Sequence, residues 1–209
     1  SEQEEKISFG ESFKLIMKNN YWLLIVGVWV FTALSMGIGM SVGTYYAKYV
    51  LGNENLAGFL TSIALIPTLV CMPFVAPLSQ KYGKRNVVKG VGSAALTGTL
   101  FAMVADTIEY GQWKTGKRVE GMLYSSTTFG AKIGAGVGMA VSMGILGAAG
   151  YVGTAAVQTE SAMSAITGLY LYAPIPFMIA LPILYYFYKL DKIYPQVMED
   201  LEKRENVGK

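Results

Sequence analysis

Long uncharged stretches alternate with short charged connections along the chain. Four stretches contain no Asp, Glu, Lys or Arg, and they cover residues 21–47, 55–80, 133–159 and 161–188. Each is longer than the roughly 20 residues that a helix needs to cross about 30 Å of hydrocarbon. A fifth uncharged stretch, 90–105, has only 16 residues but becomes a credible span if Asp106 lies at its end. The pattern predicts five transmembrane helices, over residues 21–50, 55–80, 87–110, 122–151 and 161–188.

The apolar stretches are typical of helices and not of a membrane barrel. They lack the alternation of apolar and polar residues that barrel strands need. Lipid offers the backbone no hydrogen-bond partner, so a helix that satisfies its own groups is the favoured span. We therefore predict an all-α polytopic membrane protein. Residues 1–20 predict a short amphipathic segment on the cytoplasmic membrane surface, and residues 189–209 predict a charged cytoplasmic tail.

The composition agrees with a membrane protein and excludes several kinds of site. Of the 209 residues, 53% are apolar and 15% charged, and the mean hydropathy is +0.39. The chain contains no His and a single Cys, Cys71, which excludes a disulfide framework and a Cys/His metal site. The net charge of +3 reflects lysines between the spans, so we expect no nucleic-acid partner. We also expect no enzymatic activity, because no domain outside the membrane is predicted to hold a soluble substrate.

Basic residues predict which side of the membrane each connection faces. They mark the cytoplasmic side, and they precede the first span, follow the last, and fill the connections at 81–85 and 114–118. Both termini of the chain are therefore predicted to be cytoplasmic. Only the span 87–110 separates these two connections, although one crossing cannot begin and end on the same side. Either this segment is re-entrant, or the charge rule is overridden, or a helix is missing after Arg85. We favour the missing helix, because residues 84–89 compress two loops into six residues.

Lys132 is the residue most indicative of function. It lies ten positions into the span 122–151, about 15 Å deep at 1.5 Å per residue. A cation near the membrane midplane costs roughly 2.5 to 3.5 kcal/mol, so it should face a partner or a wet cavity. Thr128 and Ser125 lie four and seven positions earlier on the same helical face. This polar stripe predicts the wall of an aqueous substrate pathway, and the alternative is a lysine that extends to the interface.

Two further groups of residues suggest gating and helix packing. Asp106 and Glu109 share a helical face near the predicted cytoplasmic boundary, and Arg118 is among the basic residues that follow. Ion pairs there would form a cytoplasmic gate, whereas the simpler interpretation is helix-end charges solvated by headgroups. Small residues at four-residue spacing allow two helices to approach closely. The second group has this spacing and consists of Gly130, Gly134 and Gly138.

These residues resemble a known transporter family. The stretch from Asp106 to Arg118, followed by Glu120-Gly121 and by residues 128–134, closely resembles the tenth and eleventh helices of the glycoside, pentoside and hexuronide cation symporters. This is the melibiose permease group of the major facilitator fold. Residues 77–85 are similar to the basic loop after the eighth helix of that fold. The resemblance implies that the chain is the C-terminal half of a twelve-helix protein, with the ninth helix absent after Arg85.

The resemblance also implies roles for the polar residues. Lys132 and Thr128 fall where the family has sugar and cation sites, and Asp106, Glu109 and Arg118 fall where it has cytoplasmic gating charges. The acidic residues that bind the coupling cation in this family belong to the N-terminal half.

One position departs from the family pattern. Nine residues before Asp106, the melibiose permease branch has an aromatic residue that contacts sugar, whereas this chain has Thr97. This departure counts against melibiose-type specificity.

The leading hypothesis is a secondary active transporter in the plasma membrane. It would import a glycoside, pentoside or hexuronide in symport with Na⁺ or H⁺ by alternating access. The expected partners are the sugar, membrane lipid and the N-terminal half of the same transporter, and the coupling cation is the only cofactor expected. Two alternatives are a non-transporting membrane scaffold formed by a truncated half, and a small channel assembled from several copies of the chain.

Overall fold

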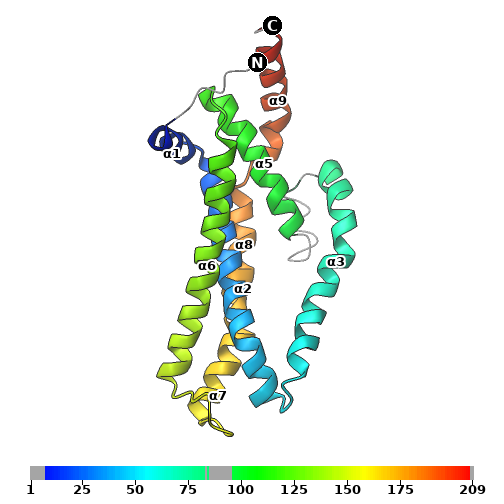
Figure 1. Cartoon of the computed structure of the whole chain (residues 1–209). Coiled ribbons are helices and arrows are strands. Elements are labelled where there is room, and N and C mark those ends of the chain that lie inside the picture. Colours follow the sequence, from blue (N-terminus) through cyan, green and yellow to red (C-terminus); the bar gives the residue numbers. More distant parts are fainter. Residues whose placement is uncertain (1–7, 83, 85–95, 208–209) are drawn as a thin grey trace.

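Helices account for all the regular structure in the part of the chain that the computed structural model describes, residues 8–82, 84 and 96–207 (Figure 1). Their bounds are α1 Phe9–Met17, α2 Asn20–Tyr45, η1 Tyr46–Val50, α3 Leu56–Tyr82, α5 Leu96–Thr115, α6 Glu120–Ala148, α7 Glu160–Thr167, η3 Gly168–Tyr172, α8 Pro174–Phe187 and α9 Leu190–Val207. The elements η1 and η3 are π-helical turns that continue α2 and α7. The predicted all-α fold class is confirmed for these residues.

The centre of the bundle is the pair α2 and α6, which run side by side over much of their lengths (Figure 1). The second half of the chain returns to this pair, because α8 and η3 both pack against α2. Two clusters of buried apolar residues fill these contacts. One contains Ile25, Val28, Leu100, Met103 and Tyr185, and the other contains Ile38, Val42, Leu146, Ile166 and Leu169.

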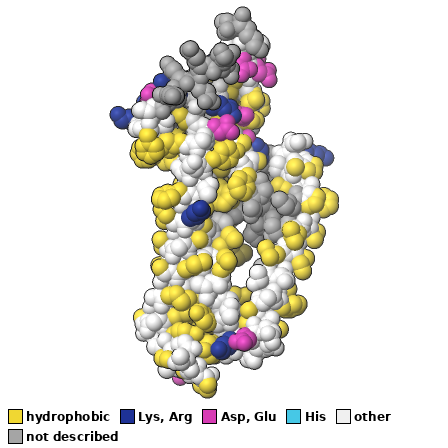
Figure 2. All heavy atoms as spheres, in the orientation of Figure 1, with side chains coloured by type: hydrophobic (Ala, Val, Ile, Leu, Met, Phe, Trp, Pro, Cys, Tyr) yellow, Lys and Arg dark blue, Asp and Glu magenta, His cyan; other side chains and the backbone are white. Residues whose placement is uncertain are grey.

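The outer surface of the bundle is apolar along its length. Figure 2 shows hydrophobic side chains over most of one face, with Lys, Arg, Asp and Glu gathered mainly toward its two ends. Large apolar side chains such as Phe59, Phe129 and Met178 are 61% to 66% exposed. Water would penalise a surface of this kind, whereas lipid tails match it.

Three helical segments are long and apolar enough to cross a membrane: Asn20–Val50, Glu120–Ala148 and Glu160–Phe187. They coincide with the predicted spans 21–50, 122–151 and 161–188. The prediction of five spans is therefore supported only in part. α3 covers the predicted span 55–80, and α5 continues five residues beyond the predicted end at Tyr110. The crossing of the membrane by these two helices stays a prediction, and the predicted junction of Arg85 with Val87 lies outside the described residues.

A rigid corner joins α1 to α2. The Asn19 side chain accepts a hydrogen bond from the backbone N–H of Trp22 (3.0 Å) and donates one to the carbonyl oxygen of Thr107 (2.7 Å). Ile16 is 1% exposed and packs with Trp22 and Ile108. Asn19 therefore caps α2 and ties the corner to α5, which fixes where α1 lies. The outward side of α1 is left with exposed Phe9 and Phe13.

The C-terminal residues form a docked helix where the sequence predicts only a charged tail. α9 packs against α5, and its Asp200 accepts a hydrogen bond from the indole N–H of Trp113 (2.9 Å). Arg204 donates to the backbone carbonyl of Trp113 (2.9 Å). Val197 on the same helix is 1% exposed. Most of the charged residues of α9 are exposed, and another face of the helix packs against α5.

Candidate functional site

The predicted polar stripe lies on the outer face of α6. Ser125, Thr128 and Lys132 are all exposed. The opposite face carries Gly134 and Gly138, which are buried against α2. The α-helical period explains this arrangement, because positions three and four apart share a face while positions two apart lie on opposite sides. Ser125, Thr128 and Lys132 thus form one polar stripe on the exposed face of α6.

Lys132 lies at one end of that stripe and near the middle of α6. It is twelve residues from Glu120, or about 18 Å along α6 at 1.5 Å per residue. Among the described residues, its ammonium group has no hydrogen-bond or ion-pair partner. The Thr128 hydroxyl donates to the carbonyl oxygen of Tyr124 (3.0 Å), which leaves its lone pairs facing outward. The stripe therefore exposes one ammonium group and two hydroxyl groups that a ligand or a neighbouring helix could contact.

The predicted packing glycines form the contact between α6 and α2. A Cβ atom at Gly134 would lie 2.6 Å from the carbonyl oxygen of Val30, and one at Gly138 would collide with the carbonyl oxygen of Leu34. Gly130 is less tight, since its Cβ would lie 3.2 Å from a Val30 methyl group. The backbones therefore approach as closely as glycine allows. This contact holds the rear of α6 while the Lys132 face stays open.

Asp106 is buried in the middle of α5, with a side chain only 4% exposed. Its Oδ1 lies 2.5 Å from the ammonium of Lys84, just beyond α3, and its Oδ2 accepts a hydrogen bond from the Tyr188 hydroxyl (3.4 Å). Lys84 also donates to the carbonyl oxygen of Ala102 (3.3 Å). Asp106 therefore forms its ion pair with Lys84. Sequence spacing alone pointed instead to the basic residues at 114–118.

Glu109 lies one turn farther along α5 and bonds to the C-terminal helix. Its carboxylate accepts a hydrogen bond from the Tyr194 hydroxyl of α9. Burial, and then the hydrogen bond to Glu109, raise the pKa of Tyr194 above its usual value. Tyr194 therefore stays neutral and keeps donating at physiological pH. No local pattern in the sequence links these residues, which are 85 positions apart.

Arg118 takes partners different from those a gate with Asp106 and Glu109 requires. Its guanidinium binds Glu120 (2.8 Å) and Gln112 (3.0 Å), and within the described residues it bonds to neither carboxylate of α5. The loop that carries it is tied to the N-terminal helix, because Lys117 pairs with Glu11 (2.8 Å). The Lys117–Glu11 ion pair thus joins the loop after α5 to α1, while the Tyr194–Glu109 hydrogen bond joins α5 to α9.

Comparison with known proteins identifies relatives of the chain. Residues 1–101 and 86–192 match the family described as MFS/sugar transport protein. The chain is 30% identical to the isoprimeverose transporter of Lactiplantibacillus pentosus (97% of this chain, 49% of the relative) and 29% identical to the uncharacterized symporter YnaJ of Bacillus subtilis strain 168 (98% and 51%). It is 25% identical to the glucuronide carrier protein homolog of Escherichia coli K12 (91% and 49%). These relatives are named as transporters and not as enzymes, and the chain spans about half of their length.

Two features of these comparisons concern the length and the overlap of the matches. The alignment with the isoprimeverose transporter extends over 237 positions, although the chain has only 209 residues. The relative therefore has residues within the aligned region that this chain lacks, in a number sufficient for one membrane helix. The two family matches also overlap, so that residues 86–101 match twice.

Proposed function

Because the chain belongs to the MFS/sugar transport family, in its glycoside, pentoside and hexuronide cation symporter group, we propose that it is one half of a secondary active transporter that imports a sugar in symport with Na⁺ or H⁺. The family match over residues 1–192 is the observation that carries the proposal. The protein acts in the plasma membrane, with both termini of this chain cytoplasmic. Its partners are the sugar, the surrounding lipid and an N-terminal half of the same transporter.

The polar stripe of α6 supplies this half's part of the transport pathway. A lysine about 18 Å along an apolar helix is costly in lipid, and a wet cavity or a carboxylate from the other half offsets that cost. Transporter sites lie near the bilayer midplane between two structural repeats, where each repeat can rock against the other. Lys132, Thr128 and Ser125 meet these requirements, because all three are exposed on one face.

The cytoplasmic pairs act as the gate of the alternating-access cycle. Asp106 with Lys84, and Glu109 with Tyr194, tie α5 to the end of α3 and to α9. If Asp106 and Glu109 exchanged Lys84 and Tyr194 for groups of the N-terminal half, the pathway would close or open without new secondary structure. Arg118 is available for such an exchange, because its present partners Glu120 and Gln112 are exposed or half-buried.

The charge pattern and the comparisons support an incomplete bundle in this chain. Basic residues mark the connections on both sides of 87–110 as cytoplasmic. The relative has additional residues within the aligned region, and one more helix after Arg85 would restore the alternation of sides. The five predicted spans then become six, which is half of a twelve-helix fold.

Uptake by the full-length protein tests the proposal. Cells or proteoliposomes containing the complete transporter are given a panel of labelled neutral and acidic glycosides, with and without a Na⁺ gradient and a pH gradient. We expect concentrative uptake of at least one sugar, and loss of accumulation when the coupling gradient is removed. Uptake that only equilibrates, with no dependence on either gradient, contradicts symport. Failure of the whole panel contradicts sugar transport.

A further inference from the structure

The short helix α7 has one polar face and one buried face. Ala162 and Ile166 are fully buried, and Ile166 packs in one cluster with Ile38 and Val42 of α2 and Leu146 of α6. Glu160, Ser164 and Thr167 follow a spacing of four and three, so they share the other face. The polar stripe of α6, with buried glycines on the opposite face, shows a division of the same kind. A polar face on a helix at membrane depth is expected to line water or a ligand.

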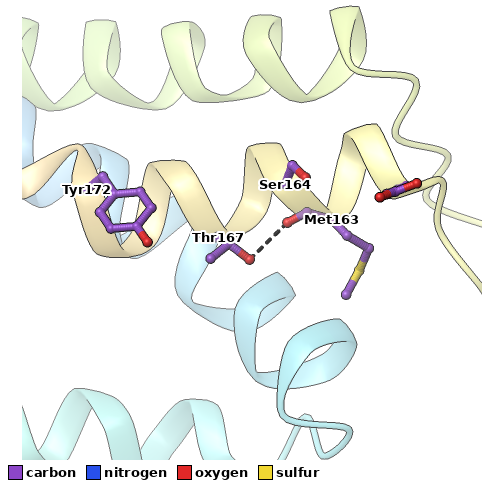
Figure 3. Close-up of a pocket in the computed structure, with 5 residues that line it drawn as sticks. Met163, Ser164, Thr167 and Tyr172 are labelled. Atoms are coloured by element: carbon purple, nitrogen blue, oxygen red, sulfur yellow. Dashed lines mark hydrogen bonds between the residues drawn. The ribbon is translucent and has the colours of Figure 1, made fainter.

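The π turn η3 extends this polar face by an aromatic ring. In an uninterrupted α-helix, residue 171 would follow Thr167 on the same side. A π turn takes one residue more, so Tyr172 occupies that side instead. Figure 3 shows Ser164, Thr167 and Tyr172 along this one stretch of helix. The Tyr172 side chain is 64% exposed. π turns are rare and are frequent at functional sites, which gives this irregularity a reason beyond packing.

These side chains line a groove of about 310 Å³, with Met163 as its fifth member. The volume is within the range of small-molecule sites, which combine an apolar wall with a few polar groups. The Thr167 hydroxyl donates to the carbonyl oxygen of Met163 (2.9 Å), so its lone pairs remain available as acceptors (Figure 3). Glu160 adds a charged acceptor, and Ser164 adds a hydroxyl that can donate or accept.

We propose that this groove is an external binding site for a neutral glycoside, separate from the Lys132 stripe on α6. The proposal rests on the proposed function, because a sugar is the substrate class that it takes as its premise. The C–H face of the sugar ring lies on Tyr172, and the sugar hydroxyls bond to Glu160, Ser164 and Thr167. Glu160 is at the end of α7 that follows the predicted external connection, so a ligand enters from outside the cell.

The charge of Glu160 gives the groove a selectivity. Hydroxyl groups that donate to a carboxylate form strong, charge-assisted hydrogen bonds. A carboxylate or sulfonate on the sugar would instead be repelled by the like charge. Among the described groove residues Glu160 is the only charged one, and no cation lines the groove to offset it. The site therefore favours neutral glycosides over acidic ones.

Transport kinetics of the full-length protein test the aromatic contact and the charge. For methyl xyloside, we expect Tyr172→Ala to raise KM about 3- to 10-fold with little change in maximal rate, since an aromatic contact contributes roughly that factor. Tyr172→Phe should stay near the wild type. Glu160→Gln should reduce the discrimination against methyl glucuronide several-fold. Tyr186→Ala serves as the matched control, because this tyrosine is 61% exposed on α8 and does not line the groove.

Cysteine labelling tests where the groove faces. Cys71 is the single cysteine of this chain, so Ser164→Cys is placed in a background without other cysteines. A membrane-impermeant maleimide added outside should label it, and methyl xyloside should protect it whereas methyl glucuronide should not. Labelling only by a lipid-soluble reagent would mean that the groove faces lipid, and this overturns the proposal.

The two proposals fail in different ways. If the wild type imports sugars but the Tyr172 and Glu160 variants change neither KM nor selectivity, the groove is not a binding site and the transport function stands. If the wild type imports no sugar, the transport function fails. Protection of Ser164→Cys by methyl xyloside then decides whether the groove binds a glycoside.

Discussion

Lys84, just beyond α3, forms an ion pair with the buried Asp106 of α5, with 2.5 Å between the ammonium nitrogen and Oδ1. The Asp106 side chain is 4% exposed and that of Lys84 22% exposed. Burial removes both groups from water, and only their mutual attraction and further hydrogen bonds offset that cost. The Tyr188 hydroxyl and the Ala102 carbonyl provide such bonds. The pair therefore fixes the end of α3 against α5 only while both charges are present.

Breaking this pair one residue at a time should be costlier than replacing both. We expect Lys84→Met to lower the free energy of unfolding by about 3 to 5 kcal/mol, because it leaves a buried carboxylate unpaired. Asp106→Leu should cost less, since the more exposed Lys84 can turn toward water. The double variant should recover most of the loss. Reversible unfolding in mixed detergent measures all three, and strictly additive effects would contradict the buried pair.

The α2 and α6 contact should respond to a single methyl group at selected glycines. Gly134→Ala places a Cβ 2.6 Å from the Val30 carbonyl oxygen, and overpacking of this kind costs about 1 to 3 kcal/mol. Gly136→Ala is the matched control, because no described atom outside its own helix lies within 4 Å of the added Cβ. The control should be neutral or slightly stabilising, since alanine is the better helix former. Equal unfolding free energies for the two variants would show that the close approach is unimportant.

The sequence predicts the helices better than it predicts their partners. Uncharged stretches of the right length predict where the long helices lie, and glycine spacing indicates a packing face. The pairing of Asp106 with Lys84 depends on how two helices meet, and spacing along one helix favours nearby basic residues such as Arg118. Likewise, nothing in the composition of residues 189–209 shows that Tyr194 would bond to Glu109.

The π turn η3 illustrates a second limit. Periodicity assumes 3.6 residues per turn, so it assigns Leu171 and not Tyr172 to the face of Thr167. Because a π turn contains one residue more than an α turn, it shifts which of the following residues lie on each face of the helix. Composition gives no sign of this shift. The sequence contains Pro174 two residues after this turn, and proline has no backbone N–H to donate to the preceding turn. The proline therefore indicates where the helix is irregular, but it does not indicate which side chains then share a face.

The docking of α9 should depend on pH through Tyr194. The raised pKa of Tyr194 means that the folded state favours its neutral form. This contribution is fully present below the ordinary tyrosine pKa of about 10 and is lost as the pH rises through the higher folded value. In a Val197→Cys variant, the thiol is shielded because Val197 is 1% exposed. Its labelling should rise above about pH 10, relative to an exposed Glu205→Cys control.

Removing the Tyr194 hydroxyl should release α9 without raising the pH. In Tyr194→Phe, labelling of Val197→Cys should increase several-fold at pH 8 and lose its dependence on pH near 10. Trp113→Phe removes the second anchor, the hydrogen bond to Asp200, and should add to the effect. Unchanged protection of Val197→Cys in both variants would mean that apolar packing alone holds α9.

Lys132 provides the sharpest test of the transport pathway. Its charge lies on the open face of an apolar helix, so it is unfavourable for insertion and has to be offset in the working protein. Lys132→Ala in the full-length transporter should abolish coupled uptake while membrane insertion stays intact, because removing a charge eases insertion. Lys132→Arg should restore only part of the activity, since a planar guanidinium and a compact ammonium bind partners differently.

A neighbouring residue on α6 separates loss of the charge from general damage to the helix. Val137→Ala changes another exposed side chain of α6, 44% exposed, and should leave uptake and its ion dependence unchanged. Measurements of sugar accumulation at several Na⁺ concentrations and pH values compare the three variants with the wild type. If Lys132→Ala accumulates sugar normally with the same ion dependence, then Lys132 is a tolerated structural residue and the polar stripe does not line the pathway.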